Sequence, residues 1–306
     1  MWNYALRRIL VTVPALWAVI TICYWMLHAT PGGPFDAERK VSAAVLANLQ
    51  AKYHLDLPAW QQYLYYFNGL LHGDLGASFR YADWSVNDLV AKALPVSLAI
   101  GGLAMLISVV LGLALGIWAA LRQNSAVDHA LMVVCNLGSA VPSFVIGPLL
   151  VMVFAIWLPW LPSGGWNDFA GRFMVLPVAL LTMINVSTVG RVMRGSLIEV
   201  LGSNFIRTAR AKGLPTRTVV LRHAMRPALL PVVSVLGPLA ISSITSAVVT
   251  ETWFSLPGLG KLIVNGAANR DYTLVLGLVV LVTVLAVMLN LLVDLAYAFL
   301  DPKIRY

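Results

Sequence analysis

The chain has 306 residues, of which 59% are hydrophobic and 11% are charged, and its mean hydropathy is +0.82. Soluble domains carry about 25% charged residues, so this composition excludes a water-soluble fold and predicts a polytopic membrane protein. The formal net charge of +8 is compatible with a nucleic-acid, lipid or acidic partner until the charges are located. Cys23 and Cys135 lie in apolar runs and predict neither a disulfide framework nor a metal site.

Six apolar runs are long enough to cross the hydrocarbon layer as helices, which needs about 20 residues each. They lie at roughly 9–28, 95–121, 131–158, 173–190, 228–250 and 273–300. The first run follows two arginines, as a signal peptide does, but it is too long for a cleaved segment and five more runs follow. We therefore expect an all-α protein with six transmembrane helices, of which residues 1–28 form the first.

The distribution of Lys and Arg predicts the orientation of these spans. Arg7 and Arg8 precede the first run, and the segment at 191–227 carries eight Lys or Arg residues against the single acid Glu199. The tail at 301–306 is also basic. We expect both termini and the 191–227 segment to be cytoplasmic.

The segment at 29–93 is too polar to span the membrane and too long for a simple loop, so we expect a small external helical unit. Ser42 is placed to cap a helix over 43–53, and Pro58 to open a second helix that Gly73 would end. One face of the second helix carries Trp60, Leu64, Phe67 and Leu71. This stripe is either a ligand platform or, more commonly, a surface that packs against the bundle or the membrane interface.

The few acidic residues near the spans lie close to expected helix ends, where a carboxylate can cap a helix. Ser85 and Asp88 form a capping box for the second span. Asp128 lies at the opening of the third span. Asp294, near the end of the sixth, is a helix-end cap, a partner of a cytoplasmic Arg or a proton relay.

The sequence GLGK at 258–261 suggests a phosphate-binding loop, but the pattern is incomplete. That motif requires a glycine where Ser255 stands and a serine or threonine where Leu262 stands. No other stretch has the motif, so any ATP that drives this protein is hydrolysed by another subunit.

The basic stretch RTARAKGLP at 207–215 is patterned rather than a plain run of charge. We expect a helix over about 197–212, a left-handed glycine at Gly213, and a second helix that begins at Pro215. Such an elbow suits either a groove on a partner protein or anionic lipid headgroups. Nucleic acid is excluded, because the stretch has no interleaved aromatic residues.

The segment EVLGSNFIRTARAKGLPTRTVVLRHAMRPALLP at 199–231 resembles the cytoplasmic loop of type I ATP-binding-cassette (ABC) importer permeases of the peptide and nickel branch. The general family signature is Glu-Ala-Ala, three residues, then Gly; here Arg207, Thr208 and Ala209 precede Gly213, a form common in the peptide branch. Other stretches that resemble the branch are LRRIL at 6–10, ATPGGP at 29–34, GDLGASF at 73–79, PVSL at 95–98, VPSF at 141–144, SLPGLGKL at 255–262, NRDY at 269–272 and DPKIRY at 301–306. Many members have Gly-Asp-Pro where this chain has Gly-Gly-Pro at 32–34, so no role of that Asp is transferred.

The resemblance covers nearly the whole chain and is greatest to the first membrane subunit of oligopeptide permeases. It implies a permease core over 94–300 with a coupling elbow at 199–227, in a bacterial inner membrane. It also implies a homologous second permease, two ATP-binding subunits that hold ATP and Mg, an external peptide-binding protein and a peptide substrate. No cofactor is expected in this chain.

In that family the elbow is the coupling helix, which docks in a cleft of the ATP-binding subunit. The docking residues that the resemblance implies are Phe205, Ile206, Arg207, Thr208, Ala209, Arg210, Ala211, Lys212, Gly213, Leu214 and Pro215. Among them we expect the three basic side chains to make polar contacts and the glycine to permit the turn.

Polar residues inside the apolar runs are candidates for the translocation pathway. They are Asn136, Ser139, Ser143, Thr182, Asn185, Ser187, Thr188, Ser242, Ser243, Thr245 and Ser246. The alternative for each is a hydrogen bond between helices, which Ser and Thr commonly make in membranes. Pro142 is expected to kink the third span.

Two other classes of function are alternatives to an ABC permease. A secondary transporter or channel would act without an ATPase and needs a coupling-ion site or inverted repeats, neither of which is detectable. A membrane enzyme needs a nucleophile, a metal motif or paired carboxylates within the spans, and the sequence has no such arrangement.

Overall fold

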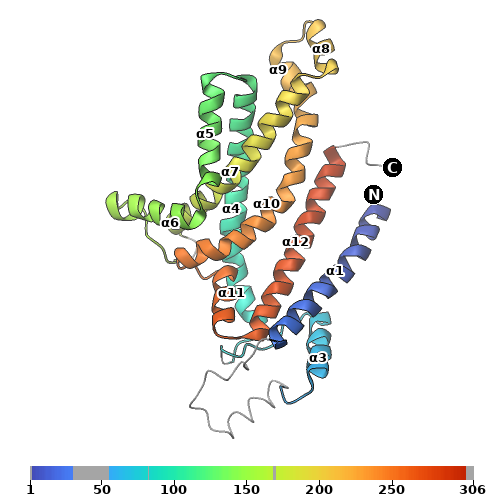
Figure 1. Ribbon diagram of the computed structural model, residues 1–306, viewed down its shortest axis with the longest axis vertical. Helices are drawn as coiled ribbons and strands as arrows, with labels where there is room; N and C mark the ends of the chain where they lie inside the picture. The colour runs from blue at the N-terminus through green and yellow to red at the C-terminus, as the bar shows by residue number, and fades with distance from the viewer. Residues whose placement is uncertain (1, 30–54, 82, 168–169, 301–306) are drawn as a thin grey trace. The chain divides into compact units, whose positions relative to one another are not determined.

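The computed structural model describes residues 2–29, 55–81, 83–167 and 170–300, and only the backbone of 2–12, 244–247 and 294–300. Its elements in chain order are α1 (Trp2–Ala29), α3 (Ala59–Leu71), α4 (Val86–Leu121), α5 (Ala126–Ala140), α6 (Ser143–Val151), the π-helix η1 (Met152–Trp157), α7 (Gly171–Leu201), α8 (Asn204–Ala211), α9 (Thr216–Thr218), the π-helix η2 (Val219–Ala224), α10 (Met225–Trp253), α11 (Leu259–Ala268) and α12 (Tyr272–Leu300) (Figure 1). Every element in the described ranges is helical, as expected. The helix expected over 43–53 and the tail at 301–306 lie outside the described residues.

The chain divides into two compact units. The first comprises residues 1–96 and 257–285, and the second comprises residues 97–256 and 286–306. Two of the three boundaries fall within helices, because α4 and α12 each contribute to both units, and the third falls in the connection between α10 and α11.

Four described helices are long and apolar enough to span a bilayer. They are Val86–Leu121, Gly171–Leu201, Thr216–Trp253 and Tyr272–Val293. In the first helix, the stretch that qualifies as apolar is Val13–Ala29, which is shorter than the other four. Counting the bent pair described next as one span gives five, so the sixth span remains a prediction.

The third expected span, 131–158, is not one helix. α5 ends at Ala140, α6 begins at Ser143, and the two segments are bent by 101°. Pro142 lies at the break with φ −58° and ψ 140°, the extended geometry that precedes the first turn of α6. The expected kink is therefore a complete break, because the backbone leaves the helical region before it resumes.

In the first unit, Asp271 joins two stretches that are far apart in the sequence. Its carboxylate is fully buried, and it accepts hydrogen bonds from the hydroxyl of Ser78 and from the backbone N–H groups of Phe79 (3.1 Å) and Arg80 (3.3 Å). It also accepts one from the N–H of Leu274 in the first turn of α12 (3.2 Å), where a carboxylate stabilises a helix N-terminus. The GDLGASF and NRDY stretches thus form one structural unit.

The other local predictions for this unit are mostly confirmed. α3 follows Pro58, Gly73 adopts φ +78° after it, and the hydroxyl of Ser85 accepts from the N–H of Asp88 at 3.1 Å in the predicted capping box. The stripe on α3 remains largely on the surface of the unit, where it is open to the membrane interface or to a ligand. Trp60 is 56% exposed and Leu71 is 71% exposed, so most of the expected stripe does not pack inside the unit.

In the second unit, glycines allow α4, α5 and α7 to approach closely. A methyl group on Gly138 of α5 would lie 1.9 Å from the carbonyl oxygen of Met183 on α7. One on Gly116 of α4 would lie 2.6 Å from the carbonyl oxygen of Gly190 on α7. Helices in membranes associate through such contacts of small residues, since burial from lipid supplies little driving force.

Candidate functional site

The basic stretch forms a helical elbow between the two longest helices of the second unit. α7 continues beyond the expected span to Leu201, and α8 begins at Asn204, so the single helix expected over 197–212 was wrong. Gly202 and Ser203 interrupt it; the hydroxyl of Ser203 accepts from no backbone N–H of α8 and instead donates to Val200 O. Figure 1 shows α8 and α9 beside the C-terminal end of α7 and the N-terminal end of α10.

The turn after α8 has the predicted conformation. Gly213 has φ +77°, in the left-handed region that a side chain disfavours, and its N–H donates to Arg210 O at 2.9 Å. We expected Pro215 to begin the next helix. It instead precedes that helix as the N-cap residue. The chain then continues through α9 and η2 into α10 without a break, so the prolines at 227 and 231 lie within one continuous helical segment.

One face of the elbow is anchored in the core of the second unit. Ile206 is fully buried and Ala209 nearly so, and both belong to a cluster with Met193 and Leu197 of α7 and Val219 of η2. A helix with apolar residues three apart places them on the same side. Although the resemblance included Ile206 and Ala209 among the docking residues, their burial leaves them no surface for a partner.

The other face of the elbow is solvent-accessible and basic. Its exposed residues within the predicted docking stretch are Phe205, Arg207, Thr208, Arg210, Ala211, Lys212, Gly213 and Pro215, and Leu214 is half-buried. Phe205 is 50% exposed beside the buried Ile206. An exposed aromatic side chain on a basic face is suited to insertion into a cleft with an acidic rim.

Several pathway candidates instead hydrogen-bond between helices. The amide of Asn185 on α7 donates to the hydroxyl of Ser243 on α10 at 2.8 Å, and the hydroxyl of Ser187 donates to that of Ser139 on α5 at 2.8 Å. Thr182 is buried and its hydroxyl donates to Ala104 O on α4 at 3.4 Å. These contacts support the alternative of helix packing.

The remaining pathway candidates differ in exposure. Ser242 is exposed, whereas Asn136, Ser143 and Thr188 are intermediate. The amide oxygen of Asn136 is buried without a hydrogen-bond partner in the described part of the chain. Thr245 and Ser246 belong to α10, and their side chains lie outside the described residues, as does that of Asp294 in α12.

Two buried carboxylates in the second unit make contacts that the sequence did not predict. Asp128, 1% exposed, accepts two hydrogen bonds of 2.6 Å from the guanidinium of Arg194 on α7. Glu251, fully buried near the end of α10, accepts a hydrogen bond from the hydroxyl of Ser97 on α4. No pattern along the sequence indicates either pair, because the partners lie 66 and 154 residues apart.

Comparison with known proteins identifies the family to which this fold and this elbow belong. Residues 112–306 match the family described as binding-protein-dependent transport system inner membrane component. The chain is 52% identical over its full length, and the full length of the relative, to the oligopeptide transport system permease protein OppB of Escherichia coli strain K12. It is 38% identical to the dipeptide transport system permease protein DppB of Bacillus subtilis, over 100% of this chain and 98% of that protein.

A solved structure of the MetNI methionine ABC transporter in an inward-facing conformation has the same fold. Its TM-score is 0.60 at 15% identity, over 70% of this chain and 96% of that chain. At this identity the likeness concerns the fold alone, whereas the family match covers both helices that flank the elbow. The chain therefore belongs to the inner membrane components of binding-protein-dependent transport systems.

Proposed function

We propose that the chain is a permease subunit of an ATP-driven importer of oligopeptides or dipeptides, in which it forms half of the translocation pathway. The observation that carries this proposal is the 52% identity to OppB over all 306 residues. Both described peptide-permease relatives match end to end, so the external segment is included as well as the permease core.

The elbow is the proposed dock for an ATP-binding subunit. Phe205 and the basic residues Arg207, Arg210 and Lys212 face outward, while the buried Ile206 fixes α8 to α7 and η2. Movement of a partner against α8 would therefore be transmitted to the two long helices. In this scheme ATP closes the pair of ATPase subunits, their motion reaches the bundle through the elbow, and this chain hydrolyses nothing.

The assembly has the orientation and partners that the charge pattern and the family suggest. Both termini and the elbow lie in the cytoplasm of a bacterial cell, and the segment at 29–93 lies outside the inner membrane. A homologous second permease completes the pathway, two ATPase subunits dock inside, and a peptide-binding protein delivers substrate from outside. The exposed side of α3, with Trp60 and Leu71, is available to lipid or to one of these partners.

Co-purification and reconstitution test the proposal against a secondary transporter or channel. A tagged chain extracted in mild detergent is expected to bring down two ATPase subunits and a second permease. Proteoliposomes with the whole assembly and the binding protein should transport a labelled tripeptide only when ATP is present on the side of the membrane where the ATPase subunits lie. Import by the isolated chain without ATP would contradict the proposal.

The variant Gly213→Val tests the elbow directly. No atom lies within 4 Å of a methyl group built on Gly213, so the expected defect comes from the backbone, at φ +77°, and not from crowding. A left-handed residue with a side chain costs about 1–2 kcal/mol, and a β-branched side chain more. We expect ATPase activity to persist while peptide import falls. The control Gly213→Asn should retain most import, since Asn tolerates this conformation.

A further inference from the structure

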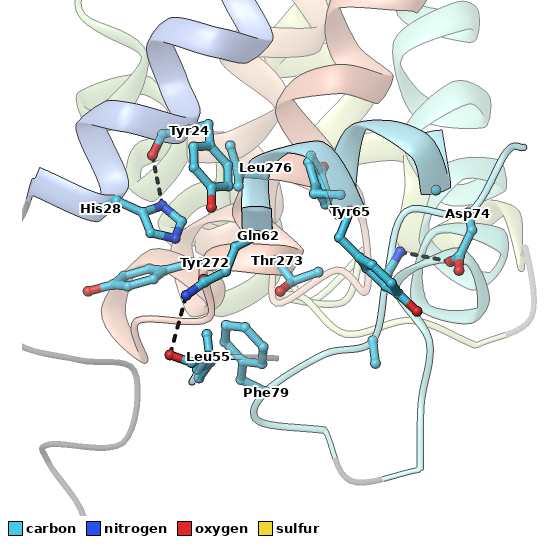
Figure 2. Close-up of a pocket in the computed structure, with 14 residues that line it drawn as sticks. Tyr24, His28, Leu55, Gln62, Tyr65, Asp74, Phe79, Tyr272, Thr273 and Leu276 are labelled. Atoms are coloured by element: carbon cyan, nitrogen blue, oxygen red, sulfur yellow. Dashed lines mark hydrogen bonds between the residues drawn. The ribbon is translucent and has the colours of Figure 1, made fainter. Parts of the chain in front are cut away.

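A cavity of about 250 Å³ lies within the first unit, apart from the elbow and the polar pairs described above. Figure 2 shows its walls, which come from the end of α1, from α3, from the stretch at 74–79 and from the start of α12. The lining residues that matter here are Tyr24, His28, Gln62, Tyr66, Asp74 and Tyr272. This volume is slightly below the range of drug-sized ligand pockets, which begins at about 300 Å³.

The polar groups that line the cavity are mainly hydrogen-bond acceptors. His28 Nδ1 lies 2.9 Å from the carbonyl oxygen of Tyr24, which can only accept, so Nδ1 is the donor in this contact, and in the Nδ1–H tautomer Nε2 is an acceptor. The Gln62 amide nitrogen donates to Leu55 O (3.3 Å) and Leu57 O (2.7 Å), which leaves the amide oxygen as the second acceptor. These contacts fix both side chains in place.

Asp74 adds a negative charge to this set of acceptors. One carboxylate oxygen accepts from the N–H of Gly76 at 2.8 Å, as Figure 2 shows, and this bond orients the side chain. No Lys or Arg stands among the lining residues in the described part of the chain. Among the described residues of the cavity wall, the carboxylate of Asp74, which is an exposed residue, therefore has no Lys or Arg beside it.

The hydroxyl of Tyr66 is a buried polar group in the cavity wall without a hydrogen-bond partner among the described residues. Burial, and then the charge of Asp74, raise the pKa of Tyr66 above its ordinary value, so the hydroxyl stays neutral and can donate or accept. Buried polar groups are almost always satisfied, and an exception in a cavity wall indicates a ligand or ordered water.

Aromatic rings complete the wall. Tyr24 stacks on His28 with ring centres 4.0 Å apart, and Tyr272 lies 6.1 Å from His28. Phe79 and Tyr65 also line the cavity. Aromatic faces attract cations, so the rings and the acceptors favour the same kind of ligand: a small ammonium ion with an apolar body.

We propose that this cavity binds the N-terminal residue of a peptide through its free α-ammonium group. An α-ammonium stands on the same carbon as an apolar side chain, which matches a carboxylate beside aromatic walls. A lysine ammonium lies at the end of a four-carbon stem, and the amine of a phosphoethanolamine headgroup lies next to a phosphate that Asp74 would repel. The choice of a peptide rests on the proposed function.

The test uses the full-length chain in nanodiscs of phosphatidylcholine, without ATPase subunits. Calorimetric titration compares the tripeptide Phe-Ala-Ala with its N-acetyl form at pH 7, where an α-amino group of pKa about 7.7 is mostly charged. We expect the acetylated peptide to bind at least about tenfold more weakly, since it loses a charge-assisted hydrogen bond and the cation–π contacts.

Variants locate the site. Asp74→Asn keeps an oxygen for Gly76 N–H but removes the charge, and it should weaken the free tripeptide about tenfold with no change for the acetylated one. Asp56→Asn, an exposed carboxylate six residues before Gln62 that does not line the cavity, is the matched control and should bind normally. Tyr66→Phe removes only the unpartnered hydroxyl and should weaken binding about threefold or more.

Equal affinity for the two peptides would overturn the proposal, as would equal affinity of Asp74→Asn and Asp56→Asn for the free peptide. If Asp74→Asn does not fold, Tyr66→Phe decides, and wild-type affinity in that variant overturns the proposal. If the whole assembly imports peptides but the isolated chain binds the free and the acetylated peptide equally, the cavity site is wrong and the proposed function stands. If the chain prefers the free peptide to the acetylated one but recruits no ATPase subunit, the cavity site stands and the proposed function is wrong.

Discussion

Arg194 and Asp128 place a bidentate ion pair between α7 and the first turn of α5. The carboxylate is 1% exposed and the guanidinium 28% exposed, so the pair is only partly screened by solvent. Asp128 also accepts from the backbone N–H of Asn124 (2.9 Å), and its own N–H donates to the hydroxyl of Ser125 (3.2 Å). The carboxylate therefore holds the turn that precedes α5 and the side of α7 at once.

Removal of the guanidinium should destabilise the second unit. Arg194→Ala leaves a buried carboxylate without its cation, and the expected loss is about 1–3 kcal/mol, below the range for fully buried pairs because Arg194 is partly exposed. Arg194→Lys should recover part of this loss, because it restores the charge without the bidentate geometry. Thermal unfolding in detergent measures the order wild type, Lys, Ala.

The control for this pair is Arg191→Ala, one turn earlier on α7. Arg191 is exposed, and the contact that defines its position is a bond from Nε to Ser187 O at 3.2 Å. Its replacement should shift the unfolding midpoint much less than Arg194→Ala. Equal shifts for the two alanine variants would show that the ion pair contributes no specific stability.

Single residues were predictable where the cause is local. Gly213 was predicted because a helix that must turn needs a residue tolerant of positive φ, and Ser85 with Asp88 because a capping box is complete within four residues. The bond from Asn185 to Ser243 joins residues 58 apart, and no local rule specifies which of several polar residues in two helices will meet.

At the scale of helices, the packing of α5 on α7 depends on one close approach. Gly138 of α5 faces the backbone of Met183 on α7. A β-carbon there would lie within 1.9 Å of a carbonyl oxygen, and a backbone atom cannot move aside as a flexible side chain can. The glycine therefore sets the distance between the helices.

Gly138→Ala should separate α5 from α7, although alanine favours a helix by about 1 kcal/mol over glycine. Because both helices must move apart, we expect a net loss of about 1–3 kcal/mol and loss of the Ser187–Ser139 hydrogen bond. Gly195→Ala is the matched control, since Gly195 lies in α7 with nothing within 4 Å of a built β-carbon. Thermal unfolding should show opposite signs for the two variants; a stabilised Gly138→Ala would refute the packing argument.

The positions of the helices were largely predictable, but their breaks were not. Hydropathy located the spans because lipid requires a continuous apolar surface, and the predicted apolar run at 131–158 extends across Pro142. The break there requires a backbone conformation that a hydropathy window does not register. Likewise Gly202 and Ser203 interrupt the expected helix. The position of α8 depends on the tertiary packing of Ile206 in the core of the second unit.

In the molecule as a whole, the proposed coupling depends on two faces of one short helix. Ile206 and Ala209 point into the core of the second unit, and Phe205 and Arg210 point outward from the same two turns. The sequence and its resemblance predicted the stretch as one docking motif, without this division of roles. The structure separates residues that hold the elbow from residues that can meet a partner.

This separation predicts opposite defects for two adjacent residues. Phe205→Ala removes a half-exposed ring and should leave the unfolding midpoint of the chain nearly unchanged, but it should weaken co-purification of the ATPase subunits at least about tenfold if the ring is an anchor of the interface. Ile206→Ala removes a fully buried side chain, so it should lower stability by about 2–4 kcal/mol. At a temperature where that variant is still folded, it should recruit the ATPase and import peptide poorly, because the docked helix is no longer fixed to α7. If Phe205→Ala lowers stability as much as Ile206→Ala does, or if Ile206→Ala abolishes recruitment while Phe205→Ala retains it, the assignment of the two faces is reversed.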